Sequence, residues 1–262
     1  MKILFIGDIV GRPARRFLGE QLPEMRKAHG VDAVIANAEN AAGGLGATPD
    51  VLDELLAMGI DVLTLGNHTW RQKELGPVLD RFETVLRPAN YPEGVPGRGS
   101  VAISIADGRK LGVVNVLGRV FMQPFACPFE TARREIDALR KSARVVLVDF
   151  HAEATSEKVA LGWYLDGTCT AVVGTHTHVQ TADERVLPKG TAYITDAGMT
   201  GPADSVIGIE SERAIHKFMT GMPNEYRLAK GAVRLCGVLI DADDETGRAR
   251  SIERVTKLEI RN

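Results

Sequence analysis

The chain has 262 residues, of which 44% are hydrophobic and 25% are charged, the composition of a folded globular protein. Its net charge of −2 argues against a protein that holds nucleic acid through bulk positive charge, so no stable nucleic-acid complex is expected. The three cysteines are widely separated, which disfavours a disulfide framework and a thiolate metal site and suits a reducing cytoplasm. No apolar run is long enough to cross a bilayer, so we expect no membrane association.

The first quarter of the chain alternates buried strands with helices. Thr48 followed by Pro49 is typical of a helix start, and Gly59 is typical of a helix end. Strands separated by helices pair in parallel through right-handed crossovers. The pattern predicts strands at 2–6, 31–36 and 61–65, with helices at 13–28 and from Pro49 to Gly59.

The rest of the chain mixes hairpin, helix and strand signals. Asp107-Gly108 predicts a tight turn between two strands, after a proline- and glycine-rich loop at 87–99. The predicted strands are 101–105, 110–116, 145–148, 170–173, 191–195, 234–240 and 251–259, and the helices are 130–141 and 156–165. No repeat or linker divides the chain. We therefore predict an α/β fold in a single domain, residues 1–262, with two layered sheets of which the second is more antiparallel.

Polar clusters follow five of the predicted strands directly. In open α/β sheets, ligands bind beyond the carboxyl ends of the strands, where such clusters meet. Four of the six histidines fall in these clusters, whereas His29 and His216 lie in helical contexts. The candidate metal ligands in the clusters are Asp8, Glu39, Asn40, Asn67, His151, His176 and His178.

Each cluster alone also has an ordinary structural explanation. Asp8 could be a helix N-cap, 37–40 a polar turn and His151 a hydrogen-bonded core histidine, whereas His176 and His178 share one face of an extended segment, as chelation needs. Five independent turns would rarely supply such donors together, so we favour a metal site. Oxygen and imidazole donors without thiolate suit iron or manganese, with zinc as a further candidate. Seven ligands exceed the need of one ion, and a carboxylate can bridge two ions about 3.5–4 Å apart.

At these clusters the sequence resembles the calcineurin-like metallophosphoesterases. That family has an Asp after its first strand, a bridging acid after its second, Gly-Asn-His after its third, then a His and Gly-x-His-x-His. The matching positions here are Asp8, Glu39, Gly66-Asn67-His68, His151 and Gly174-Thr175-His176-Thr177-His178. Departures from the common motifs occur at Val10, at Asn37-Ala38-Glu39-Asn40 and at Thr69. These departures resemble the YmdB-like phosphodiesterases, and the similarity covers nearly the whole chain.

The resemblance implies a four-layer αββα sandwich of the metallophosphoesterase type, with two mixed sheets flanked by helices. It implies two divalent ions, iron or manganese, in a cytoplasmic homo-oligomer, a dimer or tetramer. The implied substrates are cyclic nucleotides, with 2′,3′-cyclic monophosphates better supported and 3′,5′-cyclic monophosphates as further candidates. One ion would take Asp8, Glu39, Asn40 and His178, and the other Glu39, Asn67, His151 and His176. A hydroxide between the ions would be the nucleophile, and His68 the general acid.

Several polar residues near the clusters have two interpretations. For His68 the alternative is a supporting hydrogen bond without an acid role. Arg12 could steady a phosphate, whereas Arg15 and Arg16 are expected on a solvated helix face. Glu153 could orient a histidine ligand or simply be exposed. A broad-specificity phosphomonoesterase and a metal-bearing regulatory binding protein remain the alternative functions.

Overall fold

The computed structural model describes residues 1–260, and its strands form two sheets. The first is eight-stranded, in the order β2 (Asp8–Ile9), β12 (Met199–Pro202), β13 (Val233–Ala242), β1 (Lys2–Ile6), β3 (Ala33–Asn37), β4 (Val62–Thr64) and β5 (Val85–Leu86), with β14 (Ala249–Leu258) beside β13. The second is six-stranded, in the order β10 (Arg185–Val186), β11 (Ala192–Ile194), β9 (Ala171–Thr175), β8 (Val145–His151), β7 (Lys110–Leu117) and β6 (Ser100–Ser104).

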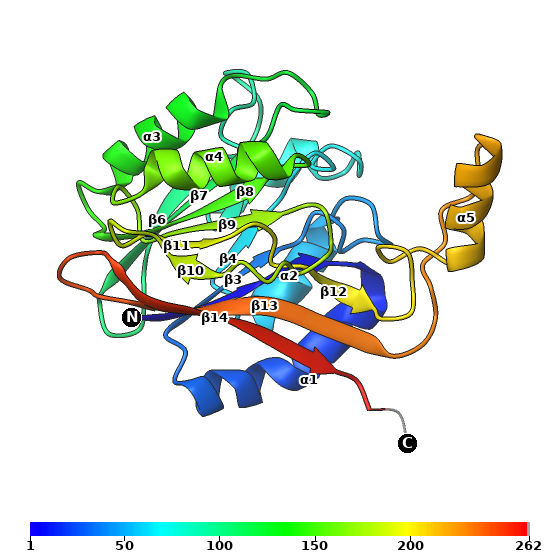
Figure 1. Cartoon of the computed structure of the whole chain (residues 1–262), viewed down its shortest axis with the longest axis horizontal. Helices are drawn as coiled ribbons and strands as arrows, with labels where there is room; N and C mark the ends of the chain where they lie inside the picture. The colour runs from blue at the N-terminus through cyan, green and yellow to red at the C-terminus, as the bar shows by residue number, and fades with distance from the viewer. Residues whose placement is uncertain (261–262) are drawn as a thin grey trace.

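Helices cover the outer face of each sheet, as Figure 1 shows. The helices α1 (Gly11–His29) and α2 (Pro49–Ala57) lie on the first sheet, and α3 (Pro128–Leu139) and α4 (Thr155–Leu165) lie on the second. The predicted four-layer αββα sandwich, with two mixed sheets flanked by helices, is therefore confirmed.

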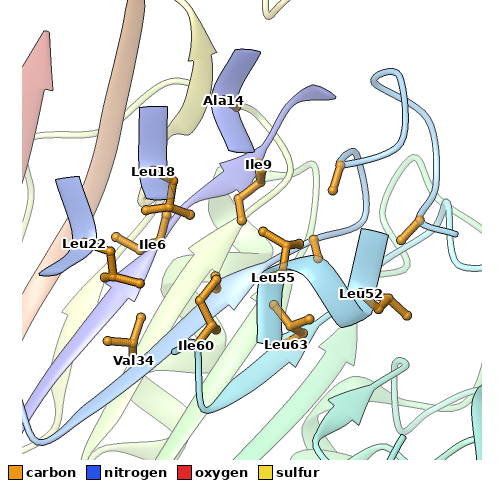
Figure 2. Close-up of a cluster of buried hydrophobic side chains, with 14 of the residues drawn as sticks. Ile6, Ile9, Ala14, Leu18, Leu22, Val34, Leu52, Leu55, Ile60 and Leu63 are labelled. Atoms are coloured by element: carbon orange, nitrogen blue, oxygen red, sulfur yellow. The ribbon is translucent and has the colours of Figure 1, made fainter. Parts of the chain in front are cut away.

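Three apolar clusters fill the spaces between these layers. Successive side chains of β1 point to opposite faces of the sheet, so Leu4 and Ile6 join the cluster under α1 and α2, while Ile3 and Phe5 join the cluster between the sheets. Figure 2 shows the first of these clusters, to which both helices contribute leucines. The third cluster lies between the second sheet and α3 and α4. Burial on both faces explains why the parallel strands are continuously apolar.

Local signals set the limits of several elements, and the predicted start of the helix at Thr48-Pro49 is confirmed. Thr48 Oγ1 accepts a hydrogen bond from Val51 N at the start of α2 (3.3 Å), and Pro49 occupies its first position. Gly30, with a φ of 61°, ends α1 in the left-handed conformation. The predicted hairpin is also present, since β6 and β7 pair antiparallel around Asp107 and Gly108.

The predicted distribution of antiparallel strands was wrong. The C-terminal strands β13 and β14 join the first sheet, where β13 pairs antiparallel with β1. The second sheet is mostly parallel, because β7, β8, β9 and β11 run the same way. Periodicity predicts a strand but not its partner, and the chain returns to the edge of β1 that β3 leaves open.

Some short elements were not predicted. They are the 3₁₀-helix η1 (Gly76–Arg81), the two-residue strands β2, β5 and β10, and the strand β12. The helical context expected around His216 is confirmed as the helix α5 (Ser211–Thr220). In Figure 1, α5 projects from the sandwich, and its one buried side chain is that of Ala214. Within residues 1–260, no helix is both long and apolar enough to span a membrane.

Candidate metal centre

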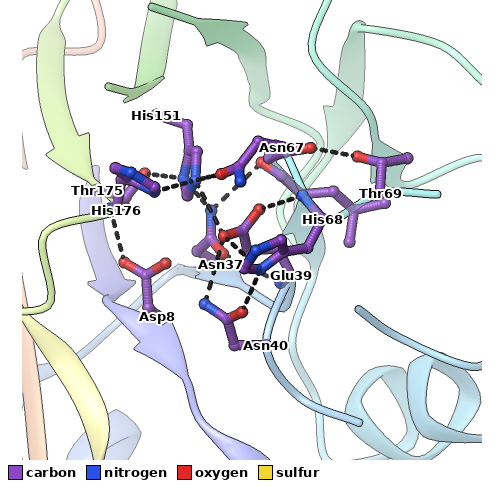
Figure 3. Close-up of polar contacts among 12 residues, drawn as sticks. Asp8, Asn37, Glu39, Asn40, Asn67, His68, Thr69, His151, Thr175 and His176 are labelled. Atoms are coloured by element: carbon purple, nitrogen blue, oxygen red, sulfur yellow. Dashed lines mark hydrogen bonds and ion pairs between the residues drawn. The ribbon is translucent and has the colours of Figure 1, made fainter. Parts of the chain in front are cut away.

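The polar ends of strands from both sheets meet at one place. Asp8 follows β1, Glu39 and Asn40 follow β3, and Asn67 and His68 follow β4. His151 ends β8 in the other sheet, and the segment carrying His176 and His178 follows β9. Figure 3 labels all of these side chains except His178 and shows the labelled ones pointing toward one another from their separate strands.

His151 lies at the middle of one half of the cluster. Its Nε2 is 3.0 Å from Glu39 Oε1, 3.0 Å from Asn67 Oδ1 and 3.1 Å from His176 Nδ1. The potential ligand atoms of Glu39, His151 and His176 all lie within 4.8 Å of one another. A carboxylate, an amide oxygen and two imidazole nitrogens that converge in this way form a donor set for a divalent cation such as zinc, iron or manganese.

Asp8 and His178 lie on the other side of Glu39 and Asn40. Asp8 Oδ2 accepts a hydrogen bond from His176 N (3.1 Å), while Asp8 Oδ1 is buried without a hydrogen-bond partner. His178 Nε2 is 3.7 Å from that oxygen and 3.1 Å from Asn40 Nδ2. His178 Nδ1 donates to Ile207 O (2.9 Å), which leaves the Nε2 lone pair directed at the cluster. A buried carboxylate oxygen without a donor is costly unless a cation meets it, so the residues fit a metal on this side as well.

Charge interactions within the cluster shift several pKa values. Burial raises the pKa of Asp8 to about 6, and the opposing charge of His178 limits the rise. Burial alone would raise the pKa of Glu39 and lower that of His151, but their mutual attraction reverses both, so the pKa of Glu39 falls and that of His151 rises to about 9. Burial, followed by the neighbouring His151, lowers the pKa of His176 to about 3, which favours the neutral ligand form.

Gly66 allows the strand ends to approach this closely. A Cβ at that position would lie 2.3 Å from Glu39 Oε2 and 2.4 Å from His151 Nε2. Any larger residue would therefore displace two of the candidate ligands.

A buried chain of hydrogen bonds orients His151. Its Nδ1 is 2.9 Å from Thr175 Oγ1, and Thr175 Oγ1 donates to Asp149 Oδ1 (2.7 Å). Asp149 also accepts from Thr64 Oγ1 and Asn37 Nδ2. Because the threonine proton goes to Asp149, the imidazole Nδ1 is the donor to Thr175, and Nε2 is directed at Glu39 and Asn67. Neither Asp149 nor Thr175 was predicted as a site residue.

A second buried pair holds the segment of His176 and His178. Lys158 Nζ donates to Asp196 Oδ2 (2.7 Å) and to Thr175 O (2.8 Å). Asp196 Oδ2 accepts in turn from Thr177 N and Thr177 Oγ1. Lys158 was not predicted as a site residue, because a lysine in a helix is usually exposed; the strand-end aspartate at position 196 was the available signal.

His68 and Glu153 both touch candidate ligands. His68 Nδ1 is 2.7 Å from Asn40 Oδ1, and His68 N donates to Glu39 Oε2 (3.0 Å). The ring is partly exposed, and burial lowers its pKa. Glu153 Oε2 is 3.1 Å from His176 Nε2, so Glu153 contacts a candidate ligand on the side away from His151.

The arginines of α1 behave differently from one another. Arg12 is exposed, and among residues 1–260 no hydrogen bond or ion pair connects it to the candidate ligands. Arg16 lies on the surface as expected, paired with glutamates. The expectation for Arg15 was wrong, because it donates to Glu54 Oε2 (2.9 Å) and Ala41 O (2.6 Å) and is mostly buried. Arg15 therefore ties α1 to α2 and to the loop that follows Asn40.

Comparison with known proteins places the chain in a family. The family model described as "YmdB-like protein" matches residues 4–255. The chain is 49% identical, over 97% of its length and 96% of the relative's, to a protein of Bacillus subtilis named 2′,3′-cyclic-nucleotide 2′-phosphodiesterase.

Two crystal structures are also similar over nearly their whole length. One is of a hypothetical protein from Thermus thermophilus, with a TM-score of 0.92 and 44% identity over 99% of this chain and 100% of that one. The other is of a Mycoplasma pneumoniae protein described as a novel phosphatase, with a TM-score of 0.91 and 35% identity over 98% and 93% of the two chains.

The fold and the buried donor set therefore define an enzyme, a hydrolase of the metallophosphoesterase type. Within that class, the chain belongs to the YmdB-like family.

Proposed function

We propose that this enzyme is a phosphodiesterase that hydrolyses 2′,3′-cyclic nucleotides at a centre of two divalent metal ions. The observation that carries the proposal is the convergence of buried oxygen and imidazole donors around Glu39, with Asp8 Oδ1 left without a hydrogen-bond partner. The Bacillus subtilis relative, which carries the activity in its name, supports the choice of substrate. Cyclic 3′,5′-nucleotides are further candidate substrates.

The residues divide into two ligand sets that share Glu39. Asp8, Glu39, Asn40 and His178 would hold one ion, and Glu39, Asn67, His151 and His176 would hold the other. When bound, the two ions would activate a water molecule and neutralise charge on the phosphoryl oxygens. Oxygen and imidazole ligands without thiolate favour iron or manganese, with zinc as a further candidate.

The charges of the ligands suit an anionic ester. Asp8 and Glu39 are the two carboxylates among the seven candidate ligands. Two divalent ions would leave this set with net positive charge, which attracts a phosphodiester. The surrounding layers bury Asp8, Glu39 and His151 completely, so little water screens that charge.

His68 is the proposed general acid. It follows the candidate ligand Asn67 directly, and its Nδ1 faces Asn40 Oδ1. If Nδ1 donates there, Nε2 is the ring atom available to pass a proton to the departing ribose oxygen. A ribose alkoxide leaves poorly unless it is protonated, so an acid at this position is useful for opening a cyclic phosphodiester.

The proposal is tested with protein purified without chelator. Elemental analysis should give two divalent ions per chain, and adenosine 2′,3′-cyclic monophosphate should be hydrolysed faster than p-nitrophenyl phosphate. Faster cleavage of the monoester would favour the phosphomonoesterase alternative. Metal-replete protein that cleaves neither ester would contradict an enzymatic role for the centre and favour a regulatory binding protein.

A further inference from the structure

A small cavity of about 270 Å³ opens beside the candidate ligands Asn67 and His176. Phe121, which belongs to the loop between β7 and α3, lines this cavity together with its neighbours Met122 and Gln123. The Phe121 side chain is 89% exposed, which is unusual for an aromatic ring next to a buried polar centre. The volume lies just below the usual range for small-molecule sites, about 300–1,000 Å³, and suits a fragment the size of a nucleobase.

Buried polar side chains fix the position of this loop. Asn90 Nδ2 donates to Leu117 O (2.8 Å) and to Ala126 O (3.1 Å), so one asparagine clamps both ends of the loop. The carboxylate of Glu157, from α4, accepts hydrogen bonds from the backbone N–H groups of the two residues before Phe121 (3.0 and 3.2 Å). These buried hydrogen bonds therefore hold Phe121 at a defined position.

The backbone at Phe121 has a positive φ angle, like the backbone at two residues of the candidate metal centre. Within residues 1–260, four residues other than glycine have positive φ: Phe121 (62°), His176 (98°), His178 (65°) and Ile207 (49°). Two of them are candidate ligands, and Ile207 O accepts the hydrogen bond of His178 Nδ1. Bulky residues adopt this conformation only where their surroundings enforce it, and such strain concentrates at functional sites. By this criterion Phe121 belongs to the site.

We propose that Phe121 is the platform on which the base of the nucleotide substrate stacks while its phosphate lies at the metal centre. This inference rests on the proposed function. Every nucleobase has an aromatic face, so stacking on one ring is favourable but tolerant of base identity. The cavity on the His178 side, about 480 Å³, has no phenylalanine, tyrosine or tryptophan in its lining. The enzyme should therefore accept all four bases, with purines favoured by their larger stacking area.

The proposal is tested with two substrates that differ only in the base. One is adenosine 2′,3′-cyclic monophosphate, and the other is the 2′,3′-cyclic phosphate of methyl β-D-ribofuranoside, which has no base. In Phe121→Ala, kcat/KM for the nucleotide should fall about 5- to 150-fold, the equivalent of about 1–3 kcal/mol of stacking, mainly through KM. Hydrolysis of the riboside should be unchanged, and Phe121→Trp should restore the nucleotide reaction. As a matched control, Phe218→Ala removes a similarly exposed phenylalanine from α5.

The outcomes separate this inference from the proposed function. Equal losses on both substrates, or no loss on either, would overturn the stacking role while leaving the phosphodiesterase intact. If the wild-type protein cleaves neither cyclic phosphate, the proposed function is wrong. The stacking role of Phe121 is then tested by measuring nucleotide binding alone. Calorimetry of metal-loaded wild type and Phe121→Ala with adenosine 3′-monophosphate should show at least fivefold weaker binding by the variant. Equal affinities would refute the subsite.

Discussion

Replacing Lys158 with methionine removes the cation that anchors the segment of His176 and His178. Lys158 is 1% exposed and donates to Asp196 Oδ2 and Thr175 O. Methionine has a similar length but no charge, so Asp196 would stay buried without its partner. Breaking a buried ion pair on one side costs about 3–5 kcal/mol. In a chain of about this size, 1 kcal/mol corresponds to roughly 2–4 °C, so Tm should fall by about 6–20 °C.

The same substitution should weaken metal binding about 10- to 100-fold, because the anchored segment carries two candidate ligands. Adding Asp196→Asn removes the orphaned charge, so the double variant should recover part of the lost stability. Chemical denaturation and metal titration of both variants measure these effects. Lys141→Met, which changes an exposed lysine after α3, serves as the matched control. A loss below about 1 kcal/mol, or a double variant no more stable than the single one, would refute the anchoring role of the ion pair.

Three further substitutions or conditions probe the centre itself. His68→Ala should keep its metals by elemental analysis but turn over about 10²–10⁴-fold more slowly, with a larger loss on a 2′,3′-cyclic nucleotide than on a nitrophenyl phosphodiester; loss of metal would make His68 a ligand instead. Gly66→Ala places a Cβ 2.3 Å from Glu39 Oε2, so the variant protein should purify with less metal. Full metal content would show that the backbone can shift to accommodate the Cβ. In chelator-treated protein His151 holds a proton up to about pH 9, and a metal must displace it. Mn²⁺ affinity should therefore rise about tenfold per pH unit from pH 7 to pH 9; a flat profile in calorimetry would contradict that role for His151.

The sandwich was predictable where periodicity is strong. The strand at 2–6 alternates its side chains between two cores, and the helix capped by Thr48 has both a start and an end signal. The partners of the C-terminal strands were not predictable, because side-chain periodicity is the same whichever sheet a strand joins. A strand as short as Asp8–Ile9 has too few residues to show a periodic pattern, so the sequence does not predict it. In the structure Asp8 nevertheless pairs with Met199 as part of the first sheet.

The residues of the site were predictable through topology rather than through any one motif. Strand ends meet at one edge of a sheet, and that rule predicts that Asp8 and Glu39 lie close together. In the structure His151 reaches the same place from the second sheet. The supporting residues carry no such signal. Lys158 is an ordinary helical lysine in sequence, and Thr175 is one of many threonines, until the fold buries them against Asp196 and Asp149.

The candidate centre concentrates features that oppose folding. Asp8 and Glu39 are carboxylates with no exposure, one oxygen of Asp8 has no donor, and His176 and His178 have left-handed backbones. Buried charge and backbone strain each cost free energy that the apolar layers must offset. Divalent cations would supply the opposite charge that these side chains lack, and a ligand that binds only the folded chain stabilises it in proportion to the logarithm of its concentration over Kd. The stability of this protein and its metal content should therefore rise and fall together, because the same buried side chains determine both.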